Sequence, residues 1–136
     1  MGNPIKMFIP LLLLCATSCA TVEDDGVAAA VTQVGMFRTA LEAFDVDCGR
    51  FPSSNEGLSA LITRPTALSD NRWRGPYLQA SAIPRDPWGH EYVYCCPGKH
   101  NTNTFDLYSL GTDGVSKTGG ADADDIASWP KGNGHQ

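Results

Sequence analysis

Residues 86–114 have the sequence DPWGHEYVYCCPGKHNTNTFDLYSLGTDG, and this stretch decides most of the fold that we expect. It contains two runs rich in aromatic and β-branched residues, EYVYCC at 91–96 and TFDLYSL at 104–110. Turn-forming residues lie between them, so the two runs predict an antiparallel β-hairpin. The leading DPWG places Asp, Pro and Gly at the positions that a type I turn favours.

A long helix is predicted on the N-terminal side of this hairpin. Asp24 or Asp25 can cap a helix that begins at about Val27, and Gly49 is a natural C-terminal stop. The polar, acidic stretch 21–26 is predicted to be a short tether. Steps of three and four residues, which are the helical period, separate the apolar positions Val27, Val31, Val34, Phe37, Leu41 and Phe44.

A second, shorter helix is predicted after the first. Ser53 and Glu56 have the spacing of a capping box, and Leu58, Leu61 and Ile62 follow them. After Leu110 the chain is rich in Gly and Asp, which predicts a loop closed by Ile126 and Trp129. The fold class is therefore α+β, with a helical stem, a short second helix, a small antiparallel sheet and a C-terminal loop.

The N-terminus has the features of a bacterial secretory signal. Lys6 is followed by the apolar run 7–16, which is too short to span a bilayer as a helix. Ala16-Thr17-Ser18-Cys19 is similar to a lipobox, in which Cys19 is lipidated and becomes the first residue; ordinary cleavage after Ala20 is the alternative. We therefore expect residues 1–18 to be a lipoprotein-type signal peptide, 19–26 a tether and 27–136 the globular domain of an exported, lipid-anchored protein.

Charge and motif content exclude several classes of function. The whole chain has a net charge of −5, and removal of residues 1–18 leaves 9 basic and 15 acidic side chains, a net charge of −6. Such an acidic domain is repelled by nucleic acid and by anionic membrane surfaces. The sequence contains no P-loop, dinucleotide fingerprint or local signature of a nucleophilic triad. We therefore expect no enzyme activity and no small-molecule substrate.

The cysteines allow one disulfide in an oxidising compartment. Cys48 follows the long helix, and Cys95 and Cys96 end the first predicted strand. Neighbours on a strand point to opposite faces, so at most one of the two can face Cys48. The sequence predicts a disulfide between Cys48 and either Cys95 or Cys96, and Cys48–Cys96 is the pair that we expect.

The acidic tail is a candidate calcium site. Asp113, Asp122, Asp124 and Asp125 lie in a segment whose glycines allow sharp bends. Calcium takes six to eight oxygen ligands from carboxylates and backbone carbonyls. A solvated acidic loop is the alternative interpretation, because Asp and Gly are ordinary loop residues. An EF-hand is excluded, since its glycine and glutamate positions are not filled.

A series of short motifs resembles one known family, the type II secretion major pseudopilin, protein G. The resemblance covers about residues 27–129, nearly the whole mature chain. The combination of DPWG, a GxDG loop and a final DI-x-x-W is far more specific than any single short motif. The motifs are Phe51-Pro52-(x4)-Gly57-Leu58-(x2)-Leu61, Arg64-Pro65, Gly75-Pro76-Tyr77-Leu78, Pro84-Arg85-Asp86-Pro87-Trp88-Gly89, Tyr92-Val93-Tyr94, Ser109-Leu110-Gly111-Thr112-Asp113-Gly114, Asp124-Asp125-Ile126 and Ser128-Trp129.

The resemblance implies a pilin-like domain in a periplasmic filament that works with an outer-membrane secretin. It also implies a calcium site formed by the carboxylates of Asp113, Asp124 and Asp125 and the carbonyls of Leu110 and Val115. Asp122 is a candidate substitute ligand.

The sequence departs from this family at the N-terminus. Relatives begin with a basic leader and a long apolar helix, whereas here the lipoprotein-type signal stands in that place. The leading interpretation is a non-enzymatic accessory of the secretion system, with other pseudopilins or secretion components as partners. The alternative is a stand-alone periplasmic binding module.

Overall fold

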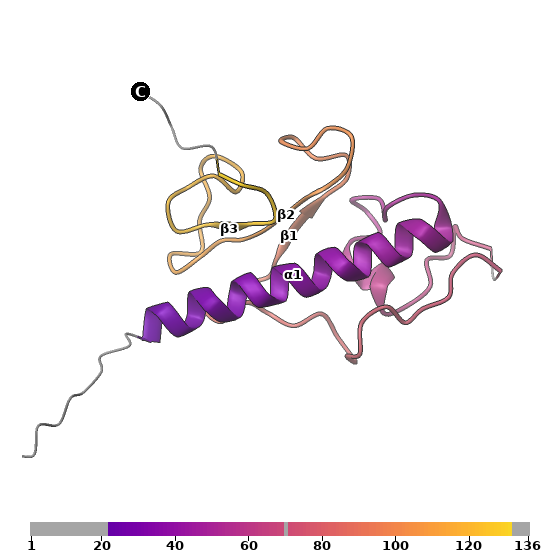
Figure 1. The fold of residues 1–136 in the computed structure, drawn as a ribbon, viewed down its shortest axis with the longest axis horizontal. Helices are drawn as coiled ribbons and strands as arrows, with labels where there is room; N and C mark the ends of the chain where they lie inside the picture. Colours follow the sequence, from indigo (N-terminus) through magenta and orange to yellow (C-terminus); the bar gives the residue numbers. More distant parts are fainter. Residues whose placement is uncertain (1–21, 70, 132–136) are drawn as a thin grey trace, which may run out of the picture.

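The computed structural model describes residues 22–69 and 71–131 and confirms the α+β class. Its elements, in chain order, are the helix α1 (Val22–Cys48), the 3-10 helix η1 (Leu58–Leu61) and the strands β1 (Val93–Cys95), β2 (Asp106–Ser109) and β3 (Ile126–Ala127). Figure 1 shows α1 running along the length of the molecule, with the small sheet beside its middle. Among the described residues, no helix is long and apolar enough to cross a membrane.

The helix α1 is longer than the sequence predicted. It begins at Val22 and not at about Val27, so residues 22–26, which the sequence predicted to be part of a tether over 19–26, are helical. Gly26 remains helical and allows close packing, since a Cβ at this position would lie 3.1 Å from the ring of Trp88. The end of α1 is as predicted: Gly49 adopts a φ of 75° and donates its N–H to the carbonyl of Asp45 at 2.7 Å.

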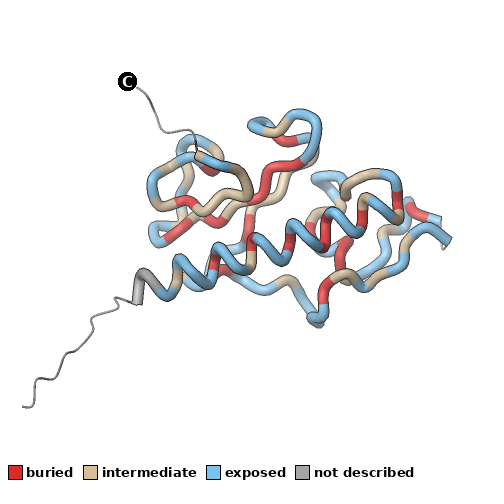
Figure 2. The backbone as a smooth tube through the Cα atoms, in the orientation of Figure 1, coloured by how far each residue is buried: buried red, intermediate tan, exposed pale blue. Residues whose placement is uncertain are grey.

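One face of α1 forms the centre of the hydrophobic core. Figure 2 shows buried residues recurring along α1 on the side that faces the rest of the domain. Phe37 contacts Tyr92 edge to face with ring centroids 5.0 Å apart, and Phe44 contacts Tyr77 in the same way at 5.6 Å. The buried core members supplied by α1 are Val34, Phe37, Ala40, Leu41, Phe44 and Cys48.

The three strands form an antiparallel sheet in the order β1-β2-β3. Val93 pairs with Tyr108 and Cys95 pairs with Asp106, so the predicted hairpin is confirmed. The strand β3 was not predicted, because Ile126 and Ala127 are too few to give a periodic pattern. They become a strand only because β2 lies beside them, with Ser109 opposite Ile126.

The short second helix is confirmed as the 3-10 helix η1, but its start differs from the prediction. The capping box forms, since Ser53 N donates to Glu56 Oε2 at 2.8 Å and Glu56 N donates to Ser53 Oγ at 3.3 Å. It closes a turn before the helix, and Gly57 is the residue at the N-cap of η1. The reason is that Gly57 adopts a φ of 62°, which interrupts the helical path after Glu56.

Candidate calcium-binding loop

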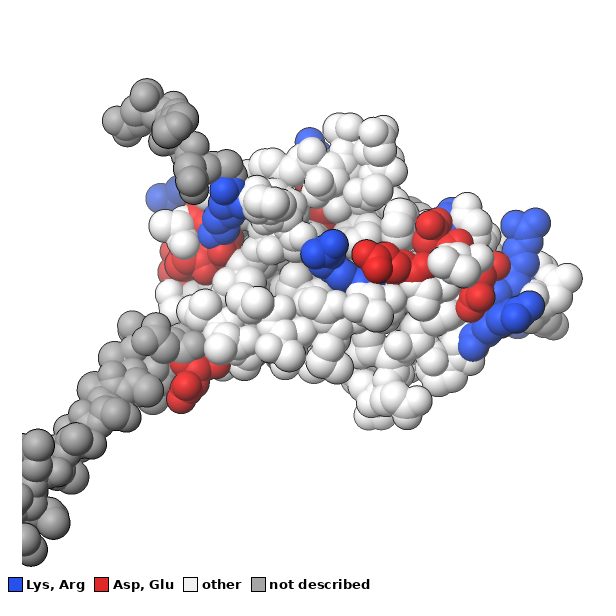
Figure 3. All heavy atoms as spheres, viewed as in Figure 1, with Lys and Arg blue, Asp and Glu red and all other residues white. Residues whose placement is uncertain are grey.

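The C-terminal loop, residues 110–125, connects β2 to β3 and doubles back on itself. Gly111 adopts a φ of 66°, and a Cβ at this position would lie 2.2 Å from the carbonyl oxygen of Asp124. The two ends of the loop therefore approach so closely that only glycine fits at position 111. Figure 3 shows acidic side chains gathered at the end of the molecule that carries this loop.

Asp125 is the most buried acidic residue of the loop, with 3% of its surface exposed. Its Oδ2 accepts hydrogen bonds from the Ser116 hydroxyl at 2.5 Å and from the Asp122 N–H at 3.0 Å. Its Oδ1 is buried and has no partner in the part of the chain that the structure describes. A buried carboxylate oxygen without a hydrogen bond is costly, so this atom calls for a donor or a cation.

Asp113 and Asp124 lie together at the opening of the loop. Asp124 Oδ2 accepts the N–H of Asp113 at 3.4 Å and the hydroxyl of Thr112 at 3.5 Å. Asp113 Oδ1 accepts the N–H of Val115 at 2.9 Å, which forms a tight turn. The structure therefore brings Asp113 next to Asp124 and turns Asp125 inward.

Asp122 has a local role within the loop. Its Oδ1 accepts the hydroxyl of Thr118 at 2.6 Å, and its Oδ2 accepts the N–H of Lys117 at 2.7 Å. These two hydrogen bonds stabilise the carboxylate and lower the pKa of Asp122. Both carboxylate oxygens of Asp122 thus already accept hydrogen bonds from residues of its own turn.

The predicted ligands of the loop are of the type that calcium prefers, but in the structure they do not surround a common position. The five predicted donors are all oxygens, the ligand type that calcium prefers. The carbonyls of Leu110 and Val115 accept no hydrogen bond from any residue that the structure describes. Within these same ranges, no three acidic, His or Cys side chains group closely enough to hold an ion by themselves. An ion would therefore have to draw Asp113 and Asp124 toward the inward-facing Asp125.

A second buried carboxylate, which the sequence did not identify as functional, supports the start of the loop. Asp86 Oδ1 accepts the N–H groups of Trp88 and His90, at 3.1 and 2.8 Å, within the predicted DPWG turn. Its Oδ2 accepts the Ser109 hydroxyl at 2.7 Å, and Ser109 Oγ accepts the N–H of Gly111 at 3.1 Å. The DPWG and SLGTDG motifs are therefore joined by hydrogen bonds, and their joint presence was the only sequence signal of this contact.

The predicted cysteine roles have different outcomes. Cys48, Cys95 and Cys96 are all free thiols in the structure. Cys48 is buried, and burial raises the pKa of its thiol; Cys96 Sγ lies 3.5 Å from the carbonyl oxygen of Thr104. The pairing of Cys48 with Cys96 stays a prediction. Cys19, the predicted lipidation site, lies outside the described residues.

The helical stem, the small antiparallel sheet on its side and the carboxylate-rich loop that closes the sheet define a pilin-like domain. The comparisons with known proteins agree with this class. Residues 19–129 match the family described as "Type II secretion system (T2SS), protein G". The chain belongs to this family. It is a family of structural components of a secretion system and not a family of enzymes.

Two curated relatives and one solved structure show how close the similarity is. The chain is 37% identical to the type II secretion system core protein G of Vibrio cholerae over 101 residues, which are 74% of this chain and 66% of the relative. It is 43% identical to that of Pseudomonas aeruginosa over 93 residues, covering 66% of this chain and 61% of the relative. The matches thus span less than two thirds of the length of these relatives.

The structural neighbour is the crystal structure of the major pseudopilin from the type 2 secretion system of enterohaemorrhagic Escherichia coli. The TM-score is 0.61 with 28% identity, and the match covers 78% of this chain and 88% of the other. The predicted pilin-like fold is therefore confirmed independently of the short motifs.

Proposed function

We propose that this protein is a non-enzymatic structural or accessory component of a type II protein secretion system. The observation that carries the proposal is the family match over residues 19–129 together with the pilin-like fold. Its partners are other pseudopilins or components of the same secretion system. Co-purification from cells that produce the whole system tests this; recovery without any such component would favour the stand-alone binding module.

The same proposal places the protein in the periplasm, held to a membrane through lipidated Cys19. The apolar run 7–16 followed by Ala16-Thr17-Ser18-Cys19 supports this. Mass spectrometry of the mature protein checks it, because a lipidated N-terminal Cys19 and an unmodified chain that begins at Thr21 differ in mass.

The C-terminal loop is proposed to bind one calcium ion, which stabilises the fold. A cation would offset the repulsion that arises when the three carboxylates are drawn together, and it would give the unpartnered, buried Oδ1 of Asp125 a partner. Asp113, Asp124 and Asp125, with the carbonyls of Leu110 and Val115, would hold the ion. The ion would cross-link the end of β2 to the chain that leads into β3.

Thermal and chemical unfolding with calcium and with chelator tests this site. At free calcium about 100-fold above the dissociation constant, binding should add about 2.7 kcal/mol to the free energy of unfolding. Magnesium should substitute poorly, because it prefers a tight octahedron and keeps its waters.

Asp113→Ala is the informative variant, since the Asp113 side chain is exposed and supports little besides the loop. It should remove the calcium-dependent gain. The matched control Glu42→Ala, an exposed acid on α1, should keep the gain in full. Identical unfolding curves with calcium and chelator, and no heat of calcium binding in calorimetry, would contradict a calcium site.

A further inference from the structure

Along the outer edge of β1, Tyr94 in the strand and Tyr92 just before it lack backbone partners among the described residues. The carbonyl of Leu107 accepts the N–H of Ser128 at 2.8 Å, so the backbone of Leu107 faces the β3 side of the sheet. Leu107 stands opposite Tyr94, and the two form a non-hydrogen-bonded pair of the antiparallel ladder. In such a pair, the backbone N–H and C=O groups of each residue point away from the other strand. The N–H and C=O of Tyr94 therefore point away from β2, and those of Tyr92, two residues earlier, point the same way.

This gap is bracketed by edge positions whose backbone groups are satisfied. On one side, Ser54 Oγ accepts the N–H of Cys96 at 2.9 Å and donates to the Cys96 carbonyl at 3.1 Å. On the other side, the carbonyl of His90 accepts the N–H of Asp86 at 2.9 Å. Between them, the outward groups of Tyr92 and Tyr94 have no partner among the described residues. Four backbone groups are therefore unpaired here, namely the N–H and C=O of Tyr92 and of Tyr94.

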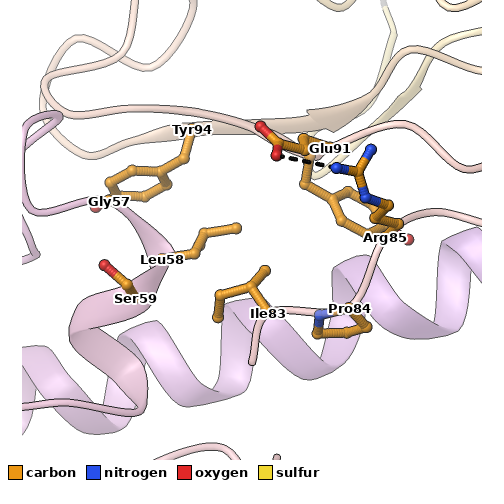
Figure 4. Close-up of a pocket in the computed structure, with 9 residues that line it drawn as sticks. Gly57, Leu58, Ser59, Ile83, Pro84, Arg85, Glu91 and Tyr94 are labelled. Atoms are coloured by element: carbon orange, nitrogen blue, oxygen red, sulfur yellow. Dashed lines mark hydrogen bonds and ion pairs between the residues drawn. The ribbon is translucent and has the colours of Figure 1, made fainter. Parts of the chain in front are cut away.

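A groove lies along this part of the edge. Its volume is about 440 Å³, and one wall is formed by Glu91, Tyr92 and Tyr94. Figure 4 shows the side chains of Leu58 and Ile83 pointing into it, and the ion pair of Arg85 with Glu91, 3.5 Å apart, at its rim. The remaining lining residues are Gly57, Ser59 and Pro84.

We propose that this groove binds an extended segment of another polypeptide, which adds a strand to β1. Unpaired strand edges are templates for such pairing, and the main-chain hydrogen bonds supply affinity. The side chains of Leu58 and Ile83 on the floor call for an apolar side chain in the bound segment. The Arg85–Glu91 ion pair at the rim is compatible with polar residues of either sign flanking that side chain. A second copy of this chain fits poorly, because its own β1 edge is recessed between the same walls.

Amide hydrogen exchange measured by NMR on the full chain in detergent micelles tests the proposal. The probe is a pool of heptapeptides Ac-Lys-Thr-Xaa-Thr-Xaa-Thr-Glu-NH2, in which Xaa is Val, Leu or Phe. At saturation, exchange of the Tyr92 and Tyr94 amides should slow at least tenfold. The amides of Val93 and Cys95, which face β2, should not change and serve as internal controls.

Two controls separate strand addition from apolar contact. The same peptides with N-methylated Xaa residues cannot donate and should lose the effect. Ile83→Trp, at a position whose side chain points into the groove, should fill it and abolish protection. Ser69→Trp, at an exposed position that does not line the groove, should leave protection intact. Unchanged exchange at Tyr92 and Tyr94, equal binding of the methylated peptides, or protection that depends on protein concentration alone would each overturn the proposal.

Discussion

The packed body around α1 and the C-terminal loop of residues 110–125 are stabilised by different interactions. In the body, Phe37, Leu41 and Phe44 are almost fully buried. The two phenylalanine rings pack against Tyr92 and Tyr77 from the following segments. In the loop, the conformation depends on carboxylate and hydroxyl groups, with Asp125 and Ser116 at the centre. The body is held by burial of apolar surface, which needs no ion, whereas the loop concentrates negative charge and has little apolar surface to offset it.

The hairpin between β1 and β2 also contains a buried carboxylate, but here the chain itself supplies the hydrogen bonds. Buried Asp106 accepts hydrogen bonds from three consecutive backbone N–H groups, at residues 99–101, and from the side chain of Asn101. Burial alone would raise the pKa of Asp106, but these hydrogen bonds outweigh it, and the pKa lies below its usual value. Asp106 is satisfied by the chain itself, while Oδ1 of Asp125 is not. This difference is why the cation that we propose belongs to the C-terminal loop and not to the hairpin.

The largest expected effect is on the body. Phe44→Ala removes a fully buried ring that contacts Tyr77, and it should lower the free energy of unfolding by about 3–5 kcal/mol. Val46→Ala, on the same helix but 83% exposed, should change it by less than about 0.5 kcal/mol. Urea unfolding checks both, and the gain from calcium should survive in each variant. A calcium response lost in Phe44→Ala would show that the two regions are not independent.

A smaller effect concerns pH. A hydrogen bond from Arg50, at 2.7 Å, lowers the pKa of Glu56 to about 2. Because this pKa lies below its usual value of 4.5, the stabilisation is complete above about pH 4.5 and is lost as the pH falls toward 2. Since the Arg50 side chain is 39% exposed, we expect solvent screening to limit the loss in Glu56→Gln at pH 7 to about 1–2 kcal/mol.

Unfolding measured between pH 7 and pH 2 checks this prediction. The wild type and Glu56→Gln should converge at the acid end. Glu91→Gln, whose parent side chain is 82% exposed, should show little difference at any pH. A constant gap between the wild type and Glu56→Gln at every pH would contradict the assigned pKa.

The smallest expected effect is a gain in stability. Gly35 lies inside α1, and a Cβ added there would meet nothing within 4 Å, so Gly35→Ala should stabilise the protein by about 0.5–1 kcal/mol. Gly49→Ala is the matched control, because its Cβ would also meet nothing but its φ is 75°. That variant should lose stability by about 1 kcal/mol from backbone strain alone. Equal changes in the two variants, measured by urea unfolding, would show that φ is not the cause.

The sequence by itself determined α1, the β1–β2 hairpin, the DPWG turn and the stop at Gly49. Each of these depends on local rules, such as the spacing of apolar residues and the backbone preferences of Gly and Pro, which act within a few residues. The resemblance to the secretion family was also visible in the sequence, because several motifs occurred in a fixed order.

Only the tertiary structure decided the features that join distant segments. Val22–Gly26 is helical, although its composition indicated a tether, and Gly26 in this segment packs against Trp88. The strand β3 exists because β2 lies beside it, and Asp86 is connected to Ser109 across 23 residues of sequence. The open edge of β1 at Tyr92 and Tyr94 likewise depends on which strands neighbour it. The physical reason is that packing and hydrogen bonding between remote residues follow from the whole fold, whereas propensities act only along the chain.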